Sequence, residues 1–415
     1  MNDFKRGLIY NYASVIILAI SGLLFNTIIV LFFDTNILGV FNQVFAYYTV
    51  FSQIAVFGIH SAIVKIASEH PEDRMKSASL CFTSILTSLG ISLIVSIIVF
   101  GLIYGIDKFF NWELAISLFP VIPALVFFSI NKVILGYINA LEQMRAYAIF
   151  QSMRNILIII SIILIFILKI NPVYIGLCFT FAEVVLFLVC TAYLILSKTI
   201  NTNFSLIDAK NLVTFGIKII PSNLLLNLNM KVDIICLGWI LNNNEIIGIY
   251  SFAILFADGF YQLFVVVRRS INPKISLIHT SNDYNFSEKF KEISVLAKKY
   301  TKMLAMPLAV LVIIGYLLLC LILQRHEYLY MALPLSIIIV AMAMNSKMII
   351  LGNSLSQCGF PTLESKVNII SVSSNFALNL VSIHFLGVYG AAIATAGSYF
   401  VLGISLRYYM NKVLI

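Results

Sequence analysis

Long apolar runs are the feature that most constrains the fold of this chain. Each run has the roughly twenty residues that a helix needs to cross about 30 Å of hydrocarbon. A helix also satisfies its own backbone hydrogen bonds, which lipid cannot do. Short segments of alternating polarity, typical of a membrane β-barrel, do not occur in the sequence. With 61% hydrophobic and 11% charged residues, the chain is predicted to be an all-α integral membrane protein.

Twelve transmembrane helices are predicted from these runs. Their ends fall at about residues 8–31, 40–64, 79–104, 114–138, 150–168, 173–196, 212–240, 247–267, 303–323, 329–352, 366–386 and 389–410. Two stretches recur: Asp34–Ala46 resembles Asn243–Ala253, and Lys132–Gly136 resembles Lys347–Gly352. Because such repeats are typical of transporters, we expect two pseudo-symmetric six-helix bundles around a central cavity. These halves would comprise residues 1–200 and 201–415.

The distribution of positive charge predicts the orientation. Of the Lys and Arg residues at or beyond the ends of the predicted spans, twenty fall on the side of the N-terminus and three (Lys108, Lys169 and Arg325) on the other. The positive-inside rule therefore predicts cytoplasmic termini, in a bacterial cytoplasmic (inner) membrane. The longest connection is residues 268–302. Its second half fits either an amphipathic helix at the inner membrane surface or a solvated linker.

Several function classes are excluded by what the sequence lacks. A formal charge of +9 could indicate nucleic-acid binding, but the sequence has no extramembrane segment large enough to present a basic surface. The six cysteines are not clustered, which favours packing over metal binding or disulfides. Phosphate-cradling glycine loops and zinc-protease motifs are missing. We therefore expect no enzyme activity and no bound cofactor, with energy coming from an ion gradient or from consumption of the product.

Residues 215–250 are apolar enough to cross a bilayer, yet they carry polar side chains inside the span. Polar groups at that depth usually line a protein-enclosed cavity, because exposing them to lipid is costly. Asn223, Asn227 and Lys231 recur at every fourth residue, which places them on one face of a helix. Pro221 is expected to kink that helix. We interpret the face as substrate-binding; alternatively, the amides bond to neighbouring helices.

Lysines near the inner ends of other predicted spans are further candidates for substrate binding. Lys132 and Lys347 lie about 8 Å inside spans four and ten at 1.5 Å per residue. Facing each other across the two repeats, they would form a cationic vestibule for a phosphate, and Lys218 would complete it. The alternative is that these side chains extend to the lipid headgroups.

Carboxylates within the spans are candidates for ion coupling. Glu183 and Asp258 fall near mid-membrane, and Asp233 shares a second face of span seven with Asn229. An isolated buried carboxylate carries a proton readily, and one surrounded by carbonyl and amide oxygens can hold Na⁺. The sequence therefore indicates H⁺ or Na⁺ as the coupling ion. Ion pairing of Glu183 and Asp258 with the lysines is the alternative.

Motifs along the whole chain carry a resemblance to a known family. They are Asn11–Ser14 with Gly22, Leu38–Asn42, Phe57–Ala62, Pro221–Asp233 with Gly248–Tyr250, Asn375, Asn379, Leu386–Gly387 and Gly390–Thr395. In this order the sequence resembles the polysaccharide-transporter family, the O-antigen (Wzx-type) flippases, of the multidrug/oligosaccharidyl-lipid/polysaccharide (MOP) exporter superfamily.

The resemblance implies a flippase with a role in lipopolysaccharide or related surface-polysaccharide biosynthesis. It would move a polyprenyl-pyrophosphate-linked oligosaccharide repeat unit to the outer leaflet by alternating access. Its expected partners are this substrate, membrane lipid and other polysaccharide-assembly membrane proteins. Three alternatives stay open. They are a cation/drug antiporter of the same superfamily, a lipid-II-type flippase, which usually has two further spans, and a membrane glycan polymerase, which should have a large outer loop.

Overall fold

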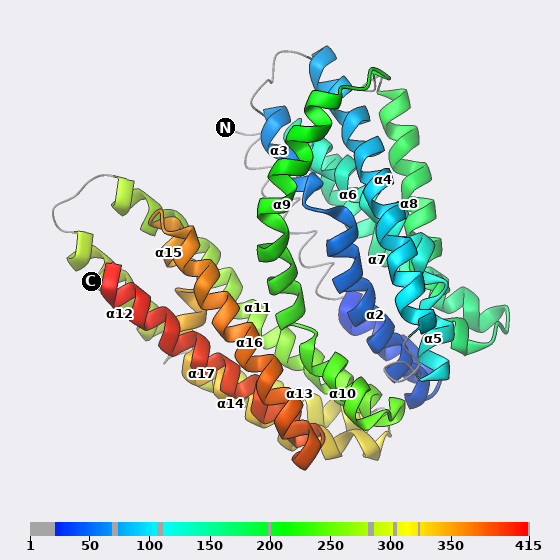
Figure 1. The fold of residues 1–415 in the computed structure, drawn as a ribbon. Coiled ribbons are helices and arrows are strands. Elements are labelled where there is room, and N and C mark those ends of the chain that lie inside the picture. The colour runs from blue at the N-terminus through cyan, green and yellow to red at the C-terminus, as the bar shows by residue number, and fades with distance from the viewer. Residues whose placement is uncertain are drawn as a thin grey trace. The chain divides into compact units, whose positions relative to one another are not determined.

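The computed structural model describes residues 21–68, 74–105, 111–197, 201–280, 286–301, 305–322 and 324–413. Within these ranges all regular secondary structure is helical (Figure 1). The predicted all-α class is therefore confirmed. The backbone falls into two compact units, Met1–Asn227 and Leu228–Ile415. The halves expected from the sequence repeat, residues 1–200 and 201–415, stay a prediction.

Unit 1 is built around one central helix. Its helices are Ser21–Phe32, α2 (Thr35–Val56), α3 (Ile59–Ser68), α4 (Arg74–Gly105), α5 (Trp112–Leu118), α6 (Val121–Ala140), α7 (Met144–Ile167), η1 (Pro172–Tyr174), α8 (Leu177–Leu196) and most of α9 (Leu206–Asn229). α6 packs against α2, α3, α4, α7 and α8. Since α6 is apolar on most sides and largely buried, it forms the core of this unit.

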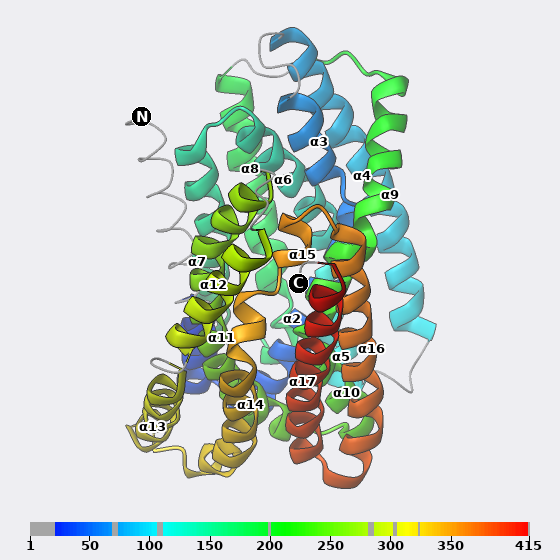
Figure 2. The same ribbon diagram turned by 90° about the vertical axis from the view of Figure 1, so that its left-hand side faces the viewer.

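Unit 2 contains the remaining helices. They are α10 (Val232–Leu241), α11 (Asn244–Thr280), α12 (Phe286–Tyr300), α13 (Met306–Ile322), η3 (His326–Met331), α14 (Ala332–Ile350), α15 (Ser354–Gln357), α16 (Pro361–Leu386) and α17 (Val388–Val413). α17 packs along both α16 and α14, which Figure 2 shows side by side. α10 packs against α16 and α17, which brings polar residues of three helices together.

The membrane-spanning helices match the predicted spans. Among the described residues, eight helices are long and apolar enough to cross a membrane, or ten when two bent pairs count as single spans. The shorter apolar helices Ser21–Phe32 and Met306–Ile322 lie where spans one and nine are predicted. The part of span one before Ser21 lies outside the described residues. The structure is consistent with twelve spans.

Span two is bent by 46° between α2 and α3. The bend is made by Phe57 (φ 52°) and Gly58 (φ 69°). This elbow lies against Gly216 of α9, where an added Cβ would lie 2.2 Å from the Phe57 carbonyl oxygen. A real Cβ cannot approach so closely, so Gly216 permits the contact, while the positive φ favours glycine at residue 58.

Span seven differs from its prediction. The predicted kink is present, because the sections Leu206–Pro221 and Asn223–Asn229 of α9 meet at 40°. The helix then ends at Asn229, and α10 starts anew at Val232. The expected stripe of Asn223, Asn227 and Lys231 is therefore wrong, since Lys231 lies between two helices. The same break separates Asn229 from Asp233, which were expected to share a second face of one continuous helix.

The connection 268–302 is mostly helical. α11 continues to Thr280, and α12 follows after five residues outside the described part. α12 buries Phe290, Ile293 and Ala297 and exposes charged residues, as expected of an amphipathic helix. For the residues of α12, the linker alternative is wrong.

The structure also shows how the two resembling stretches begin and where the cysteines lie. Asp34 caps α2 by accepting a hydrogen bond from the Ile37 amide at 2.8 Å. Its counterpart Asn243 accepts from the Ile246 amide at 3.1 Å, at the start of α11. The stretches that resemble each other thus both begin a helix by the same capping. All six cysteines are free and buried, as packing residues should be.

Candidate functional site

A buried polar cluster lies in unit 1 around Glu183 of α8, whose side chain is 1% exposed. The Tyr48 hydroxyl of α2 donates to Glu183 Oε1 at 2.8 Å. Asn131 Nδ2 of α6 donates to Glu183 Oε2 at 2.8 Å and to the Glu183 carbonyl at 2.9 Å. Donors from two other helices therefore satisfy this carboxylate.

The counter-ion of Glu183 is Arg154 of α7, with Nε at 2.6 Å from Oε1. The guanidinium carbon lies 4.5 Å from the centroid of the Phe128 ring, a cation–π contact. Arg154 Nη2 is buried and has no hydrogen-bond partner within the described residues. Glu183 thus forms an ion pair with an arginine, whereas the sequence alternative named only lysines as its partners.

Lys132 adds a second cation to this cluster. It follows Asn131 on α6, is half-buried, and its charge interacts with those of Arg154 and Glu183. Two cations and one carboxylate leave a net positive charge within the apolar helices of unit 1. Such a surplus attracts an anion.

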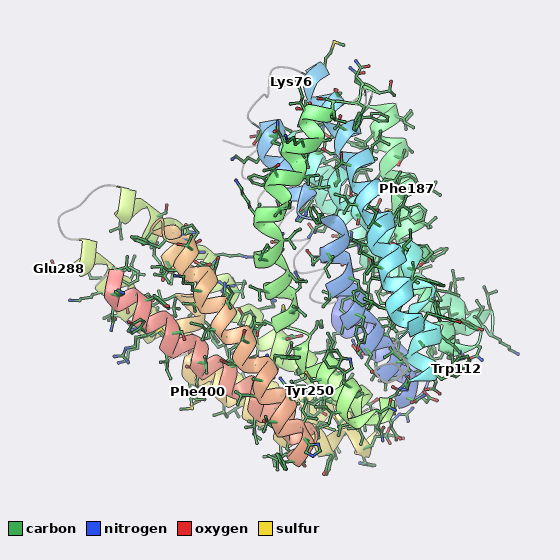
Figure 3. All side chains as sticks on the ribbon, in the orientation of Figure 1. Lys76, Trp112, Phe187, Tyr250, Glu288 and Phe400 are labelled. Carbon is green, nitrogen blue, oxygen red and sulfur yellow. The ribbon has the colours of Figure 1, made fainter. Side chains whose placement is uncertain are left out.

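A second polar cluster lies in unit 2 around Asp233, in the first turn of α10 and 5% exposed. The Tyr250 hydroxyl, labelled in Figure 3, donates to Asp233 Oδ2 at 2.9 Å. The Ile234 amide donates to Asp233 Oδ1 at 2.9 Å. The break before α10 exposes a helix N-terminus, whose partial positive charge stabilises the carboxylate.

Other charged groups of unit 2 surround Asp233. The charge of Lys231, immediately before α10, interacts with those of Asp233 and Asp258. Asp258 lies on α11 and is half-buried. This cluster therefore holds two carboxylates and one lysine, the reverse of the balance in unit 1.

Asparagines of α16 extend the second cluster. Asn375 Nδ2 donates to Asn229 Oδ1 at 3.4 Å, and Asn379 Nδ2 donates to Asn375 Oδ1 at 2.9 Å. One buried acceptor, Asn379 Oδ1, has no hydrogen-bond partner within the described residues. Asn375 and Asn379 belong to the motifs of the family resemblance but are not among the predicted site residues. Their spacing of four residues in an apolar helix is the signal that indicates a shared face.

The other predicted residues are spread over both units. Lys218 is exposed on α9, and Lys347 is half-buried in the last turn of α14. Asn227 Nδ2 donates to the Asn223 carbonyl at 2.7 Å, so this amide bonds within its own helix. The expectation that Lys132 and Lys347 face each other joins two units and stays a prediction.

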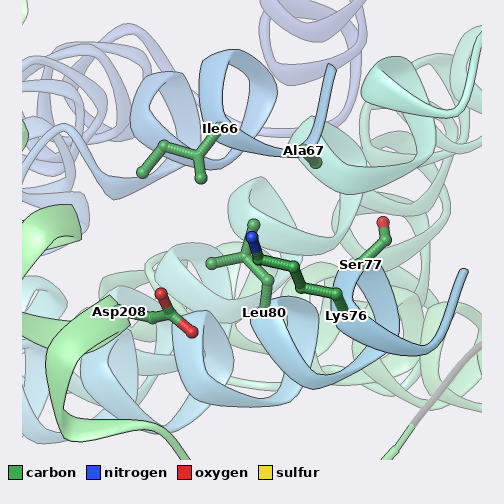
Figure 4. Close-up of a pocket in the computed structure, with 6 residues that line it drawn as sticks. All are labelled: Ile66, Ala67, Lys76, Ser77, Leu80 and Asp208. Atoms are coloured by element: carbon green, nitrogen blue, oxygen red, sulfur yellow. The ribbon is translucent and has the colours of Figure 1, made fainter. Parts of the chain in front are cut away.

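A small pocket in unit 1 lies apart from the predicted residues. It is lined by Ile66, Ala67, Lys76, Ser77, Leu80 and Asp208 (Figure 4). Lys76 and Asp208 are its charged residues, and the rest of the lining is mostly apolar. No group of three His, Cys, Asp or Glu side chains suited to a metal ion occurs in the described part of the chain.

Comparison with known proteins identifies the family. Residues 4–279 match the family model described as polysaccharide biosynthesis protein. The chain belongs to this family. The family predicted from the sequence motifs is thereby confirmed. No curated protein sequence matches the chain.

Solved structures show the same fold at low sequence identity. The lipid II flippase MurJ in an inward closed conformation has a TM-score of 0.78 and 16% identity, covering 98% of this chain and 87% of MurJ. An inward-facing multidrug resistance MATE family transporter of the MOP superfamily has a TM-score of 0.76 and 14% identity, covering 98% and 94%. The MATE transporter DinF-BH in complex with R6G has a TM-score of 0.68 and 13% identity, covering 99% and 95%. The chain thus has the fold of these membrane transporters and flippases, and its apolar helices make it a multi-pass membrane protein.

Proposed function

We propose that this protein is a flippase that moves a polyprenyl-pyrophosphate-linked oligosaccharide repeat unit, for O-antigen or a related surface polysaccharide, to the outer leaflet of the bacterial inner membrane. The observation that carries the proposal is the match of residues 4–279 to polysaccharide biosynthesis proteins in a chain with the fold of transporters. A membrane protein with these two properties serves polysaccharide synthesis by moving a precursor across the bilayer.

In this proposal, lysines capture the pyrophosphate. Lysines bind phosphate as point charges, and groups within apolar helices are screened little by water. The oligosaccharide would meet amides, while the polyprenyl tail stays in the bilayer. The proposed substrate-binding residues are Lys132, Lys218, Asn223, Asn227, Lys231 and Lys347.

The cluster around Asp233 is proposed as the site of the coupling ion, H⁺ or Na⁺. Its buried carboxylate lies on α10, which packs against α16, the helix of the unpartnered acceptor Asn379 Oδ1. Oxygen ligands suit a hard cation. Asp258 and Glu183 are further candidates. Ion binding next to the interruption of span seven would bias the conformation of the helix during alternating access.

Complementation tests the transport proposal. The chain is expressed in a strain that lacks its own O-antigen flippase, with Lys231→Ala, Lys132→Ala/Lys347→Ala and, as control, Lys210→Ala, exposed on the same helix as Lys218. We expect the wild type and Lys210→Ala to restore surface polysaccharide and the other two variants to lose it at equal expression. If every variant restores it, anion capture by these lysines is wrong.

A cation/drug antiporter is the second candidate. It is favoured by the likeness to MATE transporters and by the two carboxylates of the Asp233 cluster. Export of a cationic dye from cells that express the chain decides between the two. Dye export without restored polysaccharide in several host strains supports the antiporter, whereas restored polysaccharide without dye export supports the flippase.

A further inference from the structure

Three helices of unit 2 bring cations to one place. α12 and α17 both pack against α14. Where α17 crosses α14, an added Cβ on Gly403 would lie 2.7 Å from Asn345 Oδ1, so the Asn345 side chain packs against the α17 backbone there. Arg407 lies one helical turn beyond Gly403, and Lys347 lies two residues beyond Asn345 on α14.

The charges at this place have one sign. The charge of Lys347 interacts with those of Lys298 of α12 and Arg407 of α17. Lys298 and Arg407 are exposed, and Lys347 is half-buried. In the part of the chain that the structure describes, none of the three side chains has an ion-pair or hydrogen-bond partner. We refer to Lys298, Lys347 and Arg407 as the tricationic cluster.

Acidic side chains lie among the neighbouring cations of unit 2. The outer face of α12 carries Lys291 and Lys299 together with Glu288 and Glu292. The charge of Arg268 on α11 interacts with that of Glu364 on α16, whose Oε2 accepts a hydrogen bond from the Ser356 amide at 2.9 Å. Carboxylates thus accompany these neighbouring cations, whereas the charges that act on Lys347 at the convergence of α12, α14 and α17 are those of two further cations.

Helix dipoles do not account for this arrangement. A lysine in the last turn of a helix is stabilised by the negative end of the dipole, which fits Lys347 on α14 and Lys298 on α12. That effect needs one cation at each helix end. It does not require three cations to approach one another, because like charges at close range repel. A bound anion would remove the repulsion.

We propose that the tricationic cluster is a binding site for a phosphoryl group. Arginine offers a planar fork of donors to phosphate oxygens, and lysines add compact charges, a combination that suits this anion. Two sources share the chemistry, the headgroup of an anionic phospholipid and the pyrophosphate of the transported substrate. In the second case the inference rests on the proposed function and adds Lys298 and Arg407 to the residues that receive the pyrophosphate.

Direct binding to the purified full-length protein tests the site without transport. The probes are inorganic pyrophosphate, followed by calorimetry, and phosphatidylglycerol against phosphatidylcholine, followed as lipid retained in native mass spectrometry. The variants are Lys298→Gln, Lys347→Gln and Arg407→Gln, with Lys299→Gln as matched control because Lys299 is adjacent in α12 but lies on the face that carries Glu288 and Glu292. Lys347→Arg keeps the charge and checks that a loss is electrostatic.

We expect each neutralised variant to lower the affinity for its probe by about tenfold, the size of one charge-assisted hydrogen bond. Lys299→Gln and Lys347→Arg should bind like the wild type. If the neutralised variants lose affinity for pyrophosphate, the site is assigned to the substrate. If they lose affinity for phosphatidylglycerol alone, it is assigned to a lipid headgroup. If the wild type binds neither probe, or if Lys299→Gln weakens binding as much as the others, the inference is overturned. Complementation by the wild type is scored separately, so either proposal can fail alone.

Discussion

At the scale of single residues, the polar groups inside the spans are better satisfied than their isolation in the sequence indicates. Glu183 receives donors from three helices, and one of them is the cation Arg154. The depth of Glu183 in the membrane follows from the apolar run around it. The identity of its partner does not follow from the sequence, because Arg154 precedes it by 29 positions and lies near the end of a predicted span, among the cations on the side of the N-terminus. Local periodicity reports the face of one helix and contains no information about which helix lies opposite.

The Arg154–Glu183 pair gives the first prediction. Arg154→Met should lower the free energy of unfolding by about 3–5 kcal/mol, because it leaves a buried carboxylate without its counter-ion. The double variant Arg154→Met/Glu183→Leu should be more stable than the single variant. The measurement is thermal or denaturant unfolding in detergent, with Tyr48→Phe as a control that removes one hydrogen bond and should cost about 1 kcal/mol. A double variant no more stable than Arg154→Met would mean that the charges are not coupled.

Asp233 gives the second residue-scale prediction. If this carboxylate binds Na⁺, replacing choline chloride by NaCl should raise the unfolding temperature of the wild type, since an ion at 100 times its Kd stabilises by about 2.7 kcal/mol. Asp233→Asn should remove that increase and also the complementing activity. Tyr250→Phe keeps the carboxylate and removes only its 2.9 Å hydrogen bond, so it should retain a sodium response. Full activity of Asp233→Asn would exclude Asp233 as the coupling site, whether the ion is Na⁺ or H⁺.

At the scale of elements, the bends of spans two and seven are only partly encoded in local sequence. Pro221 predicts its kink because proline lacks the backbone donor. The interruption at Met230 and Lys231 has no such signal, since neither residue breaks helices strongly. The Asp233 cluster could therefore be predicted as a set of polar residues, but not as a helix N-terminus.

The elbow of span two gives the third prediction. Gly216→Ala places a methyl group against the Phe57 carbonyl and should lower the free energy of unfolding by about 1–3 kcal/mol, as overpacking does. Gly90→Ala in α4 is the matched control, because nothing lies within 4 Å of its added Cβ. That control should be neutral or up to about 1 kcal/mol more stable through helix propensity. Equal effects of the two variants in denaturant unfolding would show that the close contact between α9 and the elbow does not affect stability.

At the scale of the whole molecule, the fold class, the spans and the family follow from the sequence, because each depends on a property spread over the chain. The site does not, because its members lie on different helices of each unit. The residues of the Glu183 cluster run from Tyr48 to Glu183, and those of the Asp233 cluster from Asn229 to Asn379. Only packing brings such distant positions together, and the local patterns of a single sequence do not reveal which helices pack against each other.

The predicted orientation gives the fourth prediction. Met75 is 73% and Trp112 78% exposed, and the neighbouring Lys76 and Trp112 lie at opposite ends of unit 1 (Figure 3). If the N-terminus is cytoplasmic, a membrane-impermeant maleimide should label Trp112→Cys in intact cells and Met75→Cys only in inside-out vesicles. The native cysteines are buried and should give little background. The opposite pattern would reverse the topology.

The boundary between the units falls within α9, after Asn227, rather than in a connecting loop. α9 therefore ends two residues past this boundary, and the number of residues in it sets the angular phase of each side chain around the helix axis. A single residue inserted within α9 would rotate the part of the helix that follows by about 100° relative to the part before it, because an α-helix has 3.6 residues per turn. The same insertion in the exposed stretch 202–204, before α9 begins, adds length without changing that phase. Gene fusions and chimaeras of this protein should accordingly have their junctions upstream of Leu206, where the angular phase of the side chains along α9 is left intact.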